Sequence, residues 1–98
     1  MKIPKSFQVF GETITIRYDS KQLDDHDAWG RWVSKENTIT LMENGLPDDK
    51  MQKIFWHEVA HVIFDKLRFH DLAHKENEEY LVEIIGQIMN QIINSFKY

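Results

Sequence analysis

The sequence contains no cysteine, which excludes disulfide bonds and thiolate metal ligands together. A chain without cysteine is compatible with a reducing compartment. The sequence also has no apolar run that approaches the roughly 18 residues of a membrane-spanning helix. Its first residues, MKIPKSFQVFG, include no apolar stretch as long as that of a signal peptide. We therefore expect a cytoplasmic protein without a membrane partner.

The sequence also lacks a cluster of basic residues. Its 12 Lys and Arg residues are outnumbered by 16 Asp and Glu residues, and the formal net charge is −4. Nucleic-acid-binding domains usually carry a basic patch or stripe, so nucleic acid is not an expected partner. The 98 residues suffice for one compact core, and a hydrophobic content of 42% is ordinary for a globular protein. We expect residues 1–98 to form a single domain.

The first half of the chain has the alternating pattern of β-strands. Residues 13–19, TITIRYD, alternate polar and apolar side chains, and Gly11 separates them from a strand expected at 7–10. Residues 28–34 and 38–42 are separated by the turn residues KEN and predict a hairpin. The polar stretch between the two pairs of strands predicts a loop. We expect three or four strands, mostly antiparallel.

The second half of the chain predicts two helices. Residues 47–49, PDD, suit a helix start, because proline is favoured in the first turn and acids favour the positive end of the dipole. We expect helices over 47–68 and over about 76–96, joined by a connection at 69–77. The sheet cannot bury its apolar face alone, so the helices must cover it. The predicted fold is therefore α+β, a small sheet followed by two helices.

The first predicted helix contains the pattern H-E-x-x-H, formed by His57, Glu58 and His61. Spacing of four residues places both imidazoles on one helix face, where they can bind one Zn²⁺ at about 2.0–2.1 Å. Glu58 is offset from His57 by about 100° around the helix, so it can reach a water on the metal. Zinc activates that water, and the carboxylate takes its proton as general base. The motif predicts metal-assisted hydrolysis.

The surroundings of the motif strengthen this interpretation. His57, Glu58 and His61 are the only ionisable residues between Ile54 and Phe64. A helix that is apolar nearly all round is normally buried, and a buried charge is costly unless it is paired or bound to a metal. We therefore expect a shared metal site. The alternative is two core histidines satisfied by hydrogen bonds and a glutamate at the surface.

A catalytic zinc site has three protein ligands and one open position, so one ligand must come from outside the motif. The downstream candidates are His70, Asp71, His74, Glu76, Glu78, Glu79 and Glu83. The metalloprotease class with a third histidine requires Gly and His where this chain has Phe64 and Leu67, which excludes that class. Periodicity places Glu78 on the apolar face of the second helix and Glu79 off it, so periodicity alone favours Glu78.

A family resemblance favours Glu79. HEVAH, followed about 18 residues later by NEEYLVEIIG, resembles the gluzincins, which are zinc peptidases with a glutamate as third ligand. More narrowly, the chain resembles the small, often phage-encoded ImmA/IrrE-like metallopeptidases. This resemblance implies a minimal zincin-like fold in which Glu79 binds zinc and Glu83 orients a ligand histidine. It also implies that Gly86 lets the two helices approach closely. We take Glu79 as the third ligand, with Glu78 as the alternative.

The sequence therefore predicts a zinc-dependent metallopeptidase that acts on a protein or peptide. His57, His61 and Glu79 hold Zn²⁺, and Glu58 is the general base. An alternative is a weak or inactive zincin-like domain with structural zinc that acts as a protein-binding module, because so small a chain leaves little room for a walled cleft. A third interpretation has no metal at all.

Two further expectations concern the surroundings of the site. The three tryptophans, Trp29, Trp32 and Trp56, are expected mostly in the core. Residues 38–42 are expected to form an edge strand beside the site, to which a peptide substrate can add as a further strand. His26 lies in the acidic sequence DDHD, which is expected to be a solvated loop.

Overall fold

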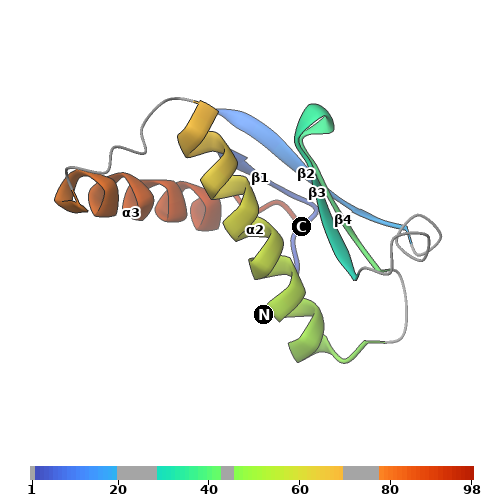
Figure 1. Ribbon diagram of the computed structural model, residues 1–98. Coiled ribbons are helices and arrows are strands. Elements are labelled where there is room, and N and C mark those ends of the chain that lie inside the picture. The colour runs from blue at the N-terminus through green and yellow to red at the C-terminus, as the bar shows by residue number, and fades with distance from the viewer. Residues whose placement is uncertain (1, 20–28, 43–45, 70–77) are drawn as a thin grey trace.

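Four strands precede two helices in the computed structural model of the chain (Figure 1). The structure describes residues 2–19, 29–42, 46–69 and 78–98. The strands form one mixed sheet, and the predicted α+β fold is confirmed. Apart from their first residues, the loop expected at 19–27 and the connection expected at 69–77 lie outside the described residues, and so does His26.

The first two strands form an antiparallel hairpin. Strand β1 (Ser6–Val9) pairs with β2 (Glu12–Tyr18) through a two-residue turn. Both turn residues have positive φ, 51° at Phe10 and 77° at Gly11. This turn geometry matches the right-handed twist of the strands, and glycine adopts a positive φ without steric cost. Gly11 therefore marks the turn, as its position between two apolar runs predicted.

The second strand of the second hairpin is an inner strand of the sheet, and the first is at the edge. Strand β3 (Gly30–Val33) pairs antiparallel with β4 (Thr38–Leu41) across the short 3-10 helix η1 (Ser34–Glu36). Strand β4 also pairs in parallel with β2, so the order is β1-β2-β4-β3. The expectation of an edge strand at 38–42 is wrong, because β4 is held between two neighbours. The edge beside the motif helix is β3.

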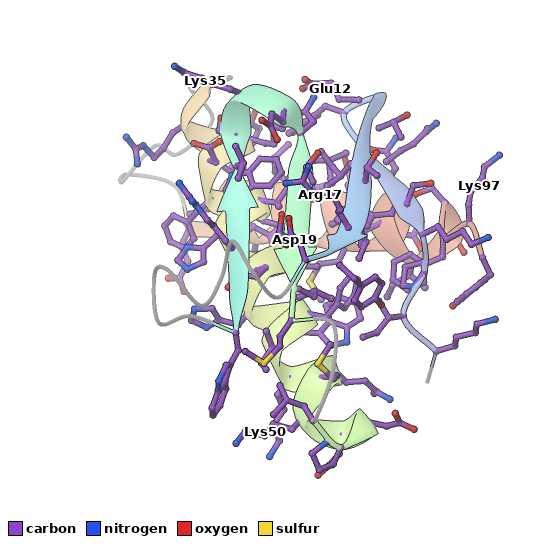
Figure 2. All side chains as sticks on the ribbon, turned by 90° about the vertical axis from the view of Figure 1, so that its right-hand side faces the viewer. Glu12, Arg17, Asp19, Lys35, Lys50 and Lys97 are labelled. Carbon is purple, nitrogen blue, oxygen red and sulfur yellow. The ribbon has the colours of Figure 1, made fainter. Side chains whose placement is uncertain are left out.

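Both helices cover the same face of the sheet (Figure 1, Figure 2). Helix α2 (Asp48–Phe69) packs against β3 and β4, and α3 (Glu78–Asn94) packs against β1. The acids of the first turn of α2 and the bases of its last turn complement the helix dipole. Among the described residues, no helix combines the length and the apolar character that crossing a membrane requires.

The core lies between the covered face of the sheet and the two helices. Phe7 of β1 meets Phe55 of α2 edge to face, with ring centroids 6.2 Å apart. The buried apolar side chains are Phe7, Val9, Ile14, Ile16, Ile39, Leu41, Phe55, Val59, Val62, Leu67, Ile88 and Ile92. Burial of these side chains fixes which face of α2 is turned to the sheet, and so which face carries the motif.

A buried lysine fixes the C-terminal part of α2 against both hairpins. The Lys66 ammonium donates to Glu12 Oε1 at 3.2 Å and to Asn37 Oδ1 at 2.9 Å. Glu12 begins β2, and Asn37 immediately precedes β4. Lys66 is only 6% exposed, so its ammonium needs such partners to compensate for its desolvation. These contacts restrict rotation of α2 over the sheet.

The expectation that Gly86 allows close approach of the helices is wrong. Within the described part of the chain, a Cβ added at Gly86 would meet nothing within 4 Å. The reason is that α3 makes its main contacts with β1 rather than along the motif helix. Gly86 is therefore an exposed helix residue and has no packing requirement.

Candidate metal centre

The H-E-x-x-H motif lies in the middle of α2, on the side that faces β3. His57 and His61 are one helical turn apart, and their Nε2 atoms are separated by 3.2 Å. Two nitrogens bound to one tetrahedral zinc at about 2.0–2.1 Å lie about 3.3 Å apart. The separation of the two imidazoles therefore fits shared coordination of one ion. It also fits a hydrogen bond between the rings when one ring nitrogen is protonated.

Glu58 completes a group of three side chains that could hold a metal ion. One ligand atom from each of His57, Glu58 and His61 lies within 4.8 Å of the others. Imidazole nitrogen and carboxylate oxygen are ligands of zinc and of several other divalent metals. The predicted metal-binding character of the motif is therefore supported by its geometry, while the choice of zinc stays a prediction.

The expectation that the motif helix is buried on all sides is wrong. Glu58 is 7% exposed, but both histidines are exposed, and Phe64 is 70% exposed. The sheet covers only one side of α2, and both histidines lie at the margin of that side, where they line an open cavity together with residues of β3. The argument from buried charge therefore applies to Glu58 alone. The exposed imidazoles leave the site open to a ligand of protein size.

The environment of Glu58 suits a general base. Burial raises the pKa of the Glu58 carboxyl, while His61, His57 and a hydrogen bond from the backbone N–H of Trp32 act in the opposite direction. A carboxylate with a raised pKa accepts a proton more readily near neutral pH than an ordinary glutamate does. The Trp32 N–H also fixes the orientation of the carboxylate.

Gly30, at the start of β3, lets the strand approach α2 closely beside Glu58. A Cβ at position 30 would lie 2.7 Å from Ile54 Cγ2 and 3.1 Å from Glu58 Cγ. A side chain there would force Ile54 or the adjoining backbone to shift. Sequence reasoning did not single out this residue. The available signal was an isolated glycine within a run of aromatic and branched residues, which often marks close backbone approach.

A second contact between β3 and α2 involves Trp32 and Asp65. The indole Nε1 donates to Asp65 Oδ2 at 3.2 Å. Asp65 lies four residues after His61 and therefore on the same side of α2. It was not among the sequence candidates, although this spacing was visible. The contact attaches the edge strand to the helix one turn beyond the motif.

The three tryptophans differ in their surroundings. Trp32 and Trp56 are partly buried and pack against the core, as expected. Trp29 is 46% exposed, so its assignment to the core is wrong. Its ring is covered instead by the Lys50 ammonium, which lies 3.9 Å from the ring centroid. Trp29 therefore belongs to the rim of the site.

The acidic candidates for the third ligand lie on α3. Glu78 and Glu79 are in its first turn, Glu83 is further along, and all three are exposed. Among the described residues, none of them belongs to the group formed by the two histidines and Glu58. In Figure 1, the N-terminal end of α3, which carries its first turn, lies away from α2. The third ligand stays a prediction.

Four other candidates, His70, Asp71, His74 and Glu76, lie outside the described residues. The structure therefore brings together the two histidines and Glu58, which come from one helix. It does not bring a described acid of α3 to them.

Two adjoining cavities lie on either side of Glu58. One has a volume of about 480 Å³ and includes Trp32, His61 and Asp65 in its lining. The other has a volume of about 430 Å³ and includes Trp29 and Ile54. Gly30, His57 and Glu58 line both. The motif therefore lies where two open cavities between β3 and α2 adjoin, and we call the two together the groove.

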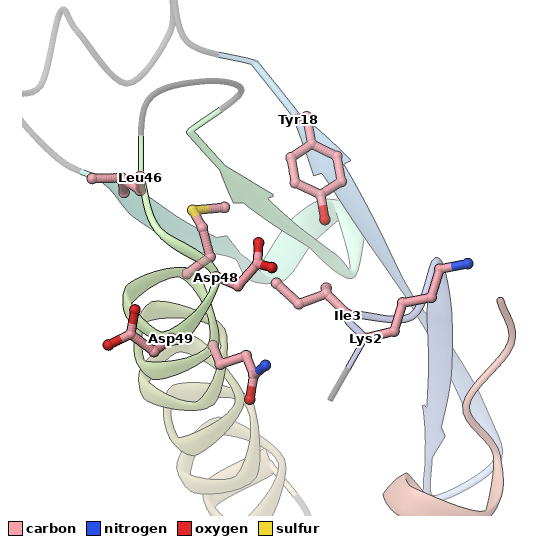
Figure 3. A pocket seen from close by; sticks show the side chains of 8 residues that line it. Lys2, Ile3, Tyr18, Leu46, Asp48 and Asp49 are labelled. Atoms are coloured by element: carbon pink, nitrogen blue, oxygen red, sulfur yellow. The ribbon is translucent and has the colours of Figure 1, made fainter.

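A larger cavity of about 830 Å³ lies at the N-terminal end of α2 (Figure 3). Its described lining residues include Lys2, Tyr18, Asp48 and Asp49, and none of those described is a histidine. Burial raises the pKa of the Tyr18 hydroxyl. This cavity is separate from the motif and lacks its chemistry.

The chain matches no protein-family model, no curated protein and no solved structure. The interpretation of the site therefore rests on the residues and geometry of this chain.

Proposed function

We propose that the protein is a zinc-dependent metallopeptidase with Glu58 as its general base. The observation that supports this most directly is the 3.2 Å separation of the His57 and His61 Nε2 atoms beside a buried carboxylate. In the proposal these histidines hold Zn²⁺ together with Glu79, or alternatively Glu78, and Glu83 orients a ligand histidine. The resemblance to ImmA/IrrE-like gluzincins is part of the proposal.

The residues of the site have distinct roles in hydrolysis. When bound, zinc supplies Lewis acidity, which polarises the scissile carbonyl and activates water. Glu58 accepts a proton as the water oxygen forms a bond with the carbonyl carbon. Glu58 then donates that proton to the amine nitrogen as the C–N bond breaks. The N–H of Trp32 keeps the carboxylate in place during both transfers.

The buried position of Glu58 favours catalysis over a structural role for the metal. A structural zinc site is closed by four ligands and has no need of a free carboxylate held beside it. Burial of that carboxylate costs stability, since desolvation disfavours its charged form. Retention of such a group is explained when it transfers protons.

A second candidate function is a protein-binding module with structural zinc. The observation that favours it is the open site, in which both histidines are exposed and no described acid of α3 joins them. In this function the metal stabilises the fold, and chelation unfolds the domain. Glu58→Gln would then leave the biological activity intact.

The proposal places the protein in the cytoplasm, with a protein or peptide as substrate. The absence of cysteine is compatible with a reducing compartment. The open groove on both sides of Glu58 suits an extended polypeptide rather than an enclosed small molecule.

The test compares wild type with Glu58→Gln in cleavage of an unfolded protein by the zinc-loaded chain. We expect cleavage by the wild type and a loss of about 10²–10⁴-fold in Glu58→Gln, because general base catalysis contributes about that factor. Both proteins should contain about one zinc per chain. Equal cleavage by the two proteins would contradict the role of Glu58. Zinc without cleavage by the wild type would favour the binding module.

A further inference from the structure

Basic side chains surround the groove although the protein is acidic overall. Lys50 and Lys53 line the cavity on one side of Glu58, and Arg31 and Arg68 line the cavity on the other. Among the described residues, the acids in the two linings are Glu58 and Asp65. The groove is therefore positive in a chain whose formal net charge is −4.

These four cations are available to a ligand. All four are exposed, and within the described ranges none of them forms an ion pair. Lys50 instead contacts the ring of Trp29. Asp65, an acid in the lining of the groove, already accepts a hydrogen bond from Trp32. The two acids of the lining offset only part of the charge of the four cations, so the described lining keeps an excess of positive charge.

Aromatic side chains accompany the cations on both sides. Trp29 is 46% exposed in one cavity, and Phe64 is 70% exposed in the other. A long groove that combines cations with exposed aromatic rings can contact the acidic and the apolar side chains of a polypeptide at the same time. A small anion would use only part of this surface.

We propose that the substrate is an acidic polypeptide segment, with Asp or Glu side chains on both sides of the cleaved bond. This inference rests on the proposed peptidase function and names the substrate class of the same site. Lys50 and Lys53 bind the acids on one side of Glu58, and Arg31 and Arg68 bind those on the other. Each exposed contact is expected to contribute about two- to fivefold to affinity.

The experiment uses the full zinc-loaded chain and three peptides that share a central Ala-Leu bond. The residues before Ala and after Leu are Glu in the first peptide, Gln in the second and Lys in the third. We expect kcat/KM for the Glu peptide to exceed that for the Gln peptide at least tenfold. The Lys peptide should be the poorest substrate, and the preference should shrink as salt is added.

Two charge-reversal variants test the residues named. They are the double variants Lys50→Glu with Lys53→Glu and Arg31→Glu with Arg68→Glu. Each should reduce or invert the preference for the Glu peptide, mainly through KM. The matched control is Lys97→Glu, because Lys97 is an exposed cation far from Lys50 (Figure 2). Circular dichroism establishes that each variant is folded.

The outcomes separate this inference from the proposed function. Cleavage of all three peptides at similar rates would overturn the acidic preference and leave the peptidase intact. Preference for the Glu peptide that survives both double variants would also overturn the inference. If no peptide is cleaved, fluorescence anisotropy of the labelled peptides with Glu58→Gln still tests the groove. Selective binding of the Glu peptide would support it, and equal binding would overturn it.

Discussion

Glu58 combines a cost to folding with a proposed role in chemistry. Its side chain is buried beside two imidazoles, and burial raises its pKa. Glu58 is buried in the folded protein and solvated in the unfolded chain. Folding therefore disfavours the charged form of its carboxyl group. The residue that would remove a proton from water is thus also a residue that limits stability.

Glu58→Gln should stabilise the metal-free protein at neutral pH. The folded state holds the Glu58 proton more tightly than the unfolded state, because the folded pKa is above the ordinary value of 4.5. The contribution of Glu58 to stability is therefore fully present below that ordinary value and is lost as pH rises through the folded pKa. Glutamine has no such loss and still accepts the Trp32 hydrogen bond.

Urea unfolding in the presence of a chelator measures this effect. The free energies of unfolding of wild type and Glu58→Gln should be similar at pH 4 and should favour Glu58→Gln at pH 7. A wild type that is more stable than Glu58→Gln at pH 7 would show that Glu58 forms favourable charge interactions in the absence of metal.

Gly30→Ala should destabilise the protein and impair cleavage. The added Cβ would lie 2.7 Å from Ile54 Cγ2, so the Ile54 side chain, β3 or α2 must shift. We expect a loss of about 1–3 kcal/mol in the free energy of unfolding, the usual cost of overpacking. The matched control is Gly86→Ala, where the added Cβ meets no described atom within 4 Å. That variant should gain about 0.5–1 kcal/mol, since alanine is the better helix former. Denaturant unfolding measures both, and equal stabilities would refute the close contact at Gly30.

At the scale of elements, the site is an interface between α2 and the edge strand β3. The helix supplies His57, Glu58 and His61, and the strand supplies the N–H that orients Glu58. The bond from Trp32 to Asp65 attaches the same strand to the next turn of the helix. We therefore expect Asp65 to act as a positioning residue in the proposed activity, because it holds Trp32, whose backbone N–H bonds Glu58.

Asp65→Ala should lower kcat about tenfold with little change in KM, because small displacements of a catalytic group are costly. It should also lower the free energy of unfolding by about 1 kcal/mol, the usual contribution of one hydrogen bond. Asp65→Asn retains an oxygen that accepts the indole N–H, so it should restore kcat. Steady-state kinetics checks both variants. A kcat that is unchanged in Asp65→Ala would refute the positioning role.

Local signals predicted the elements better than their arrangement. The sequence PDD located the start of α2 to within one residue, and alternation located β2. The inner position of β4 depends on its parallel pairing with β2, a contact between segments far apart in the chain. No local pattern specifies that pairing. For the same reason, Gly30 and Asp65 became visible as parts of the site only when β3 lay against α2.

At the scale of the whole molecule, completion of the proposed metal site depends on the position of the first turn of α3 relative to α2. The motif was readable in the sequence because its three residues are on one helix, where spacing determines geometry. The third ligand comes from a different element, so spacing alone left Glu78 and Glu79 as alternatives. In the structure, the first turn of α3 stands away from the motif. Zinc coordination by Glu79 would require that turn to approach the histidines.

Isothermal titration calorimetry of the metal-free full chain with zinc tests the central claim most directly. The account predicts one zinc per chain for the wild type, loss of binding in His57→Ala and retained binding in Glu58→Gln. Glu79→Ala should weaken binding by more than about 100-fold, since outer partners of a metal site alone contribute about 10–100-fold. Glu78→Ala should bind as the wild type does, and the reverse order would make Glu78 the ligand. Absence of saturable binding by the wild type, or binding that persists unchanged in His57→Ala, would contradict the account.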